Sequence, residues 1–185
     1  MIEPSINSDE LLGDIRAMIE GGRQQVARSA NAALTMTYWQ IGKRLLIEKL
    51  TDGRGEYGHR ILATVSQELE KEFGKGFNYS ALTRMVRFAE QFSDEQILAT
   101  LLQELTWSHF TVLLPLKDPL AREFYAEMCR SDRWSVRTLR QKIDNMLYER
   151  TALSKNSDEL VRRELASMRE GRMTPDLDNM CGEFK

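Results

Sequence analysis

The spacing of proline is the feature that most constrains what this chain can fold into. Its four prolines are Pro4, Pro115, Pro119 and Pro175, so residues 5–114 contain none. Proline breaks helices because it lacks a backbone donor and clashes with the preceding turn. Over residues 9–50 apolar side chains recur at three- and four-residue spacing, which is typical of helix. We find no strand pattern and predict an all-α, multi-helix fold.

Turn and capping signals divide the chain into successive helices. We expect Gly21-Gly22 to weaken or bend the first stretch, since glycine costs about 1 kcal/mol relative to alanine inside a helix. Residues 51–55 are a predicted turn. Further helices are predicted at about 60–73, from about 80, after Ser93, and at about 109–114, 119–130, 135–150 and 156–171. Their predicted capping residues include Ser93, with Gln96 as its capping-box partner, and Ser108, Asp118 and Ser135. We assign residues 1–8 to a flexible N-terminus, 9–171 to one helical domain and 172–185 to a linker or tail.

Bulk properties favour a cytoplasmic protein. The two cysteines, Cys129 and Cys181, are isolated and fit neither a disulfide framework nor a metal site. The first residues lack the pattern of a signal peptide, and no apolar run approaches the roughly 20 residues that a membrane helix needs. The formal net charge is −2, so binding to nucleic acid would depend on a local patch.

A first candidate patch lies in residues 69–92, which have the pattern of a helix-turn-helix. An amphipathic helix, a short glycine-containing turn and a second helix follow one another. Tyr79 and Thr83 lie at the start of the second helix, where recognition helices contact bases or phosphates, and Arg84 and Arg87 lie opposite its apolar stripe. The alternative is an ordinary helical hairpin whose arginines only face solvent.

A second candidate patch lies in residues 130–150. Six cations against three acids give this segment a charge of +3, and a helix capped by Ser135 leaves Arg137 and Arg140 facing outward. Such a patch would neutralise phosphates and make binding salt-dependent. A solvated helix face is the alternative. The charged residues are Arg130, Arg133, Arg137, Arg140, Lys142 and Arg150 against Asp132, Asp144 and Glu149.

Catalytic and metal-binding patterns are weak. His109 has no titratable partner nearby in sequence and is predicted, like His59, to be a structural hydrogen-bonding residue. The sequence Glu183-Phe184-Lys185 resembles part of a nuclease motif, but it lies at the extreme C-terminus without strands around it, and we interpret it as chance. We therefore predict no enzymatic activity, cofactor, metal or small-molecule substrate.

Several motifs together resemble the N-terminal domain of the YhcG-like proteins (DUF1016). The resemblance covers about residues 11–177 and implies a domain similar to a winged helix-turn-helix, usually followed by a PD-(D/E)xK nuclease domain. The catalytic carboxylates of that nuclease domain have no counterparts in this sequence. The motifs are Tyr38-Trp39-Gln40-Ile41-Gly42, Tyr57-Gly58, Gly76-Phe77-Asn78, Leu105-Thr106-Trp107-Ser108-His109, Arg122-Glu123-Phe124-Tyr125, Trp134-Ser135-Val136-Arg137-Thr138-Leu139 and Tyr148-Glu149-Arg150.

These observations lead to two hypotheses about function. The first is a DNA-binding or DNA-targeting module of a YhcG-like nuclease that lacks its own catalytic domain, with DNA contacts from Arg84, Arg87, Arg137 and Arg140. The second is a protein-interaction module without DNA contact, in which the long N-terminal helix forms a homodimer or binds a nuclease partner. The second predicts an exposed apolar stripe along residues 9–50.

Overall fold

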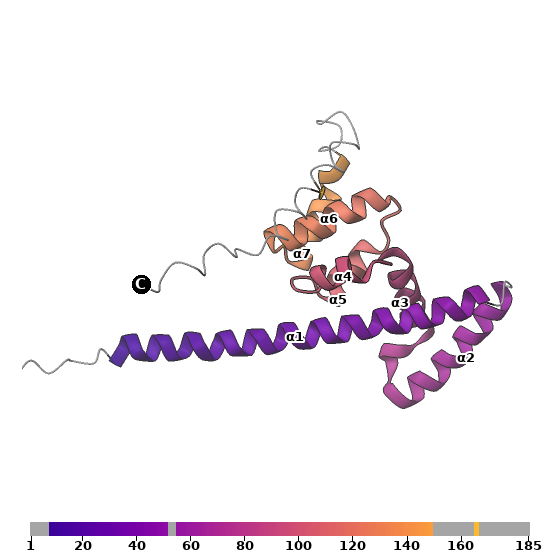
Figure 1. The fold of residues 1–185 in the computed structure, drawn as a ribbon, viewed down its shortest axis with the longest axis horizontal. Helices are drawn as coiled ribbons and strands as arrows, with labels where there is room; N and C mark the ends of the chain where they lie inside the picture. Colours follow the sequence, from indigo (N-terminus) through magenta and orange to yellow (C-terminus); the bar gives the residue numbers. More distant parts are fainter. Residues whose placement is uncertain (1–7, 52–54, 150–164, 167–185) are drawn as a thin grey trace, which may run out of the picture.

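The structure, a computed structural model, describes residues 8–51, 55–149 and 165–166. Every regular element in this part of the chain is a helix and none is a strand, so the predicted all-α fold is confirmed (Figure 1). The elements in chain order are α1 (Ser8–Thr51), α2 (Gly55–Phe73), the 3-10 turn η1 (Lys75–Phe77), α3 (Tyr79–Gln91), α4 (Glu95–Leu101), α5 (Trp107–Leu113), α6 (Pro119–Asp132) and α7 (Val136–Asp144).

Helix α1 is 44 residues long and has two different halves. Residues 9–30, which we call the arm, are all exposed, and the N-terminal part of the arm extends beyond the other helices (Figure 1). Gln25, Arg28 and Ser29 of the arm line a hollow together with Ala99 of α4 and Leu102 and Gln103, which follow α4. The following half packs on the body of the molecule and buries Thr35, Trp39 and Gly42. The helix continues through Gly21-Gly22 without the bend that the sequence led us to expect. Two glycines are tolerated because the turns on both sides supply continuous helical hydrogen bonds.

An aromatic cluster forms the centre of the core. The rings of Phe88 and Phe110 lie 4.7 Å apart, and those of Phe92 and Phe110 lie 5.1 Å apart at nearly a right angle. Trp39 from α1 is buried beside them, with 2% of its surface exposed. Burial of such large rings is the main source of stability in a small helical domain. The cluster thus joins α1 and α3 to α5, and continues into α6.

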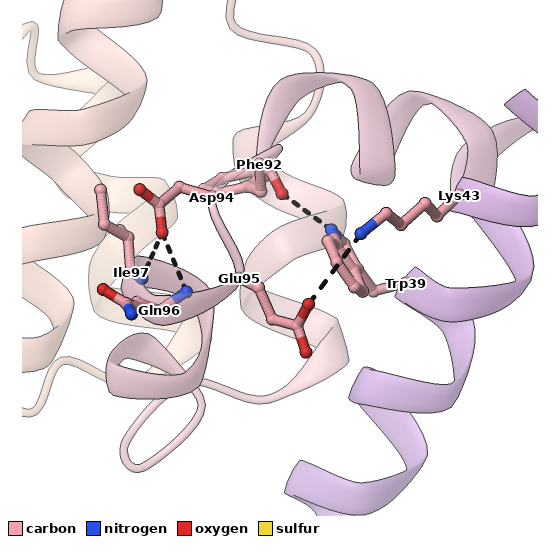
Figure 2. A network of polar contacts seen from close by, with 7 residues as sticks. All are labelled: Trp39, Lys43, Phe92, Asp94, Glu95, Gln96 and Ile97. Carbon is pink, nitrogen blue, oxygen red and sulfur yellow. Dashed lines mark hydrogen bonds and ion pairs between the residues drawn. The ribbon is translucent and has the colours of Figure 1, made fainter. Parts of the chain in front are cut away.

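Trp39 also ties α1 to the junction between α3 and α4 by polar contacts (Figure 2). Its indole nitrogen donates to the carbonyl of Phe92 at 2.7 Å, which satisfies the one polar atom of a buried side chain. The Lys43 ammonium lies 4.5 Å from the Trp39 ring centroid and 3.9 Å from the Glu95 carboxylate. The backbone carbonyl of Phe92, the residue that follows the end of α3, is therefore held against α1.

The helix caps confirm two sequence predictions and correct two. Asp118 and Ser135 cap α6 and α7 as predicted. Ser93 was the wrong residue for α4, because the Asp94 carboxylate accepts from the backbone amides of Gln96 and Ile97 at 2.9 and 3.0 Å (Figure 2). A charged acceptor at a helix N-terminus also interacts favourably with the helix dipole.

The cap of α5 is the second correction. Thr106, with extended backbone, stands at the N-cap instead of Ser108, so α5 begins two residues earlier than the predicted helix. The backbone N–H of Thr106 donates to the His109 ring nitrogen Nδ1 at 3.1 Å. This is the capping-box contact, in which the side chain three residues after the N-cap accepts from the N-cap backbone, so His109 can make it only with residue 106.

Some helix boundaries also differ from the prediction. Helix α2 begins at Gly55, five residues before the predicted start, and α6 extends to Asp132. Helix α7 ends at Asp144 because the chain turns at Met146, which has a φ of 52°, before helical backbone resumes at residues 147–149.

Other predictions fall outside the described residues. These are residues 52–54 of the predicted turn 51–55, the terminal segments 1–7 and 172–185, and all of the predicted helix 156–171 except residues 165–166, which are helical. The two end residues of that turn, Thr51 and Gly55, are helical and belong to α1 and α2. The assignment of residues 9–171 to one domain stays a prediction. No helix in the described part of the chain is both long enough and apolar enough to cross a membrane.

Candidate nucleic-acid interface

A tight connection turns the chain from α2 into α3. Gly74 adopts a φ of +87°, a conformation that glycine reaches without steric cost, and it accepts from the Phe77 amide across the 3-10 turn. Asn78 then caps α3, because its side chain accepts from the Ala81 amide at 2.9 Å. The predicted order of helix, turn and helix is present. The wing that the resemblance implies has no counterpart in the described residues, which contain no strand.

Close contact with α1 fixes the position of α3. The buried side of α3 carries Leu82, Met85 and Phe88, and it packs along the body half of α1. A Cβ atom at Gly42 would lie only 1.9 Å from the Met85 carbonyl oxygen, so the two backbones approach as closely as a glycine allows. Gly42 belongs to one of the family motifs, but the sequence did not predict this packing role, because spacing within one helix does not show which residue a second helix crosses. The opposite face of α3 is therefore held in a fixed orientation.

That exposed face carries two arginines. Ser80, Arg84 and Arg87 are spaced at i, i+4 and i+7, so they lie on one side of the helix, and all three are exposed. Arg84 donates to the Ser80 hydroxyl at 3.2 Å. Within the described residues no carboxylate lies at ion-pair distance from Arg84 or Arg87. The face can therefore offer two guanidinium groups to an anion without first breaking an ion pair.

Tyr79 and Thr83 lie beside this face and not on it. The Tyr79 hydroxyl lies 2.9 Å from Nδ1 of His59 on α2, so His59 is a hydrogen-bonding residue as predicted. The Thr83 hydroxyl donates to the backbone carbonyl of Tyr79 at 2.8 Å. Both side chains line a cavity of about 80 Å³ between α1, α2 and α3. Tyr79 is 40% exposed, so it borders the arginine face, whereas the Thr83 hydroxyl is already engaged.

The second candidate patch contains fewer available cations than its charge of +3 indicates. Arg130 is buried and pairs with Glu127 at 2.8 Å, and Arg133 pairs with Glu104 at 3.5 Å. Lys142 lies 5.5 Å from the centroid of the Trp134 ring. The side chain of Arg150 lies outside the described residues. The sequence spacing could not reveal the Arg133 pair, because Glu104 belongs to a distant segment.

Arg137 and Arg140 keep the outward position that the sequence predicts. Both are exposed on α7, and within the described residues neither has a carboxylate at ion-pair distance. Helix α7 packs on α5 and α6, whereas α3 packs on α1 and α2. The structure therefore presents two arginine pairs on separate parts of the body and does not bring them into one cluster.

The remaining polar residues serve the fold. Nε2 of the buried His109 donates to the Trp134 carbonyl at 2.9 Å while Nδ1 accepts from Thr106, so the predicted structural role is confirmed. Burial lowers the pKa of His109, and the hydrogen bond to Trp134 partly opposes this change. Burial, assisted by Asp132, raises the pKa of Cys129 to about 12. A thiol that stays protonated is a poor nucleophile.

Metal ligands are not grouped in the part of the chain that the structure describes. No three His, Cys, Asp or Glu side chains there lie close enough together to hold an ion. The Glu183-Phe184-Lys185 pattern lies outside the described residues.

Residues 14–150 match the DUF1016 N-terminal domain family. The chain belongs to this family. The protein named "Putative nuclease YhcG" of Escherichia coli (strain K12) is 28% identical over 176 residues, which cover 79% of this chain and 47% of that protein. The chain thus spans less than half the length of this relative. The resemblance found in the sequence motifs is confirmed. No solved structure matches the chain at a significant level.

Proposed function

We propose that this DUF1016 N-terminal domain is a DNA-contacting module of a YhcG-like nuclease. The observation that carries the proposal is the exposed face of α3, where Arg84 and Arg87 share one side of a rigidly held helix and have no carboxylate partner among the described residues. Arginine suits this role because its planar guanidinium group makes two parallel hydrogen bonds to a phosphate or to guanine.

Arg137 and Arg140 would add phosphate contacts from a second position. Because α7 lies on the opposite part of the body from α2 and packs on α5 and α6, its arginines would contact a different stretch of the DNA backbone. Contacts of this kind orient a protein on the duplex and carry no sequence information. The proposal therefore assigns α3 to groove or backbone contact and α7 to supporting electrostatic contact.

Cleavage of DNA, in this proposal, belongs to the part of YhcG-like proteins that follows this domain. The relative is named a nuclease and the chain matches 47% of its length. We expect the chain alone to leave supercoiled plasmid intact in the presence of Mg²⁺. Cleavage by the chain that is lost on Glu183→Ala would contradict this assignment, since it would show that the C-terminal pattern is catalytic.

The test of the DNA proposal is binding to a fluorescently labelled duplex across a salt series. Each phosphate contact contributes about 0.9 to the slope of log affinity against log salt concentration. The Arg84→Ala/Arg87→Ala variant should therefore weaken binding, and it should lower the slope by up to about 1.8 if both arginines contact phosphates. Arg44→Ala is the matched control, because Arg44 is also an exposed arginine but pairs with Glu48 of the same helix, α1, at 2.7 Å. The control should keep the slope of the unchanged chain.

Two outcomes would contradict the DNA proposal. One is the absence of binding at low salt, and the other is equal binding by the unchanged chain and by a variant lacking Arg84, Arg87, Arg137 and Arg140. The second result would mean that the two exposed arginine pairs do not contact DNA.

A further inference from the structure

A cavity of about 130 Å³ lies between the end of α3, helix α4 and the first half of α6. We call it the α3–α6 cavity. An apolar cavity of about 150 Å³ holds one benzene ring, so this cavity has room for a single small ring or a short branched chain. Its apolar walls are formed by Phe92, Ile97, Leu101, Pro119 and Ala126.

Arg122 brings an unpaired donor to this cavity. The residue lines the cavity from α6, and only 8% of its surface is exposed. Its Nη2 donates to the Leu116 carbonyl at 2.9 Å, but its buried Nε–H has no hydrogen-bond partner within the described residues. A buried donor without a partner costs free energy, so this position favours a ligand that carries an acceptor.

Gln91, the last residue of α3, brings an unpaired acceptor to the same cavity. Its Nε2 donates to the Leu114 carbonyl at 3.4 Å, whereas its buried Oε1 has no partner in the part of the chain that the structure describes. Rotating the side-chain amide by half a turn would place Oε1 against the Leu114 carbonyl, which is also an acceptor. The cavity therefore favours a ligand that carries a donor as well.

The charged side chains around the cavity disfavour an ion. Asp94, Glu123 and Glu127 line it together with Arg122. The Asp94 carboxylate accepts from two backbone amides of α4, and Glu127 pairs with Arg130 at 2.8 Å. An anion would lie near three carboxylates, and a simple cation would lie near a buried guanidinium from which it could not accept. The cavity therefore suits an uncharged group that both donates and accepts.

Water donates and accepts too, but it is a poor match to the apolar walls. A buried water typically makes about three hydrogen bonds, and the walls formed by Phe92, Ile97 and Leu101 offer no side-chain partner. An amide meets both requirements. Its carbonyl can accept from Arg122, its N–H can donate to Gln91, and its apolar body can be buried against the walls.

We propose that the α3–α6 cavity is a binding site for a small uncharged amide. The amide carbonyl accepts from Nε of Arg122 and the amide N–H donates to Oε1 of Gln91, while a short branched alkyl group packs on Phe92 and Ile97. No covalent step is involved. The site is separate from the four arginines assigned to DNA and does not depend on that proposal.

An NMR titration of the full chain with isobutyramide tests the site. We expect saturable shifts of the Arg122 Nε–H signal and of the backbone amide signals of Gln91 and Ala126. Methyl isopropyl ketone has the same shape but carries a methyl group in place of the NH₂ group. It should bind at least about tenfold more weakly, because it leaves Oε1 of Gln91 without a donor. Isobutyrate, the matching anion, should not bind.

Gln91→Met tests the acceptor directly. Methionine keeps the length of the side chain and removes its polar atoms, so the preference for isobutyramide over the ketone should fall to about equal affinity. Gln141→Met, at an exposed position of α7, is the matched control and should keep the preference. Thermal melting shows whether each variant folds. If Gln91→Met does not fold, the three ligands of equal shape still decide the question on the unchanged chain.

Three results would overturn the amide proposal. The first is no saturable shift with isobutyramide, which would mean that the cavity holds water only. The second is equal affinity of the unchanged chain for the amide and the ketone, and the third is a preference that persists in Gln91→Met. The titration contains no nucleic acid and leaves Arg84, Arg87, Arg137 and Arg140 in place, so this proposal and the DNA proposal fail separately.

Discussion

The two halves of α1 have similar helical patterns and opposite surroundings. The body half buries Trp39 and Gly42 against α3, whereas the arm leaves all of residues 9–30 exposed. The difference arises from complementary shape, not from apolar content. Gly42 lets the Met85 backbone approach, and the Phe92 carbonyl accepts from Trp39. The arm stays exposed, and only its residues Gln25, Arg28 and Ser29 lie near α4. Apolar spacing in the sequence predicts that a segment is helical. Only the structure shows which other segment, if any, packs against that helix.

The largest expected difference between the halves comes from truncating one large side chain in each. Trp39→Ala should lower the free energy of unfolding by about 3–5 kcal/mol, because it leaves a cavity and removes the donor to Phe92. Met18→Ala, at a position 74% exposed, should change it by less than about 0.5 kcal/mol. Urea unfolding followed by circular dichroism measures both. Similar losses in the two variants would show that the arm is packed within the monomer.

A glycine-to-alanine substitution should have opposite effects on the free energy of unfolding in the two halves of α1. Gly42→Ala forces a Cβ onto the Met85 carbonyl and should destabilise the chain by about 1–3 kcal/mol. Gly21→Ala meets no atom and should stabilise the helix by up to about 1 kcal/mol, since alanine favours helix. Helical ellipticity and melting temperature report both effects. Stabilisation by Gly42→Ala would mean that α1 and α3 are farther apart than described.

The smallest effect should be a pH dependence confined to the body. Burial disfavours the charged form of His109, so its pKa is lower in the folded chain and the unfolded chain binds the proton more readily. Stability should be greatest above the unfolded pKa of about 6.5 and decline as pH falls below it. Protonation would also remove the acceptor for the Thr106 amide.

Tryptophan fluorescence is suited to this measurement because the arm contains no tryptophan. Urea unfolding at pH 7.5 and 5.5 should show the lower midpoint at pH 5.5, and His109→Gln should reduce the difference. Equal pH dependence in that variant would assign the effect to another group.

Local signals in the sequence predicted much of the fold. The caps Asp118 and Ser135 followed from residue type and position, because an N-cap satisfies backbone amides only three residues away. Where two candidate caps were adjacent, as with Ser93 and Asp94, the choice depended on the stronger charged acceptor. The outward position of Arg84 and Arg87 likewise followed from helical spacing.

Features that depend on distant segments could not be predicted. Arg133 pairs with Glu104, so its charge is not available in the basic patch. Thr83 lines a cavity that forms only because α2 packs beside α1 and α3. The exposure of the arm could not be predicted either, because the apolar periodicity of residues 9–30 would look the same if the arm were buried. The local helix faces were therefore predictable, and their partners were not.

The uninterrupted course of α1 limits how the length of this helix can change in related proteins. Inserting one residue near position 31 would rotate the arm by about 100° relative to Trp39 and lengthen it by about 1.5 Å. The exposed apolar side chains of the arm, such as Ile15 and Ile19, would then project in a new direction while the body stayed the same. Insertions or deletions of seven or eleven residues nearly preserve the direction. We therefore expect relatives that keep the arm to differ in length here by such steps.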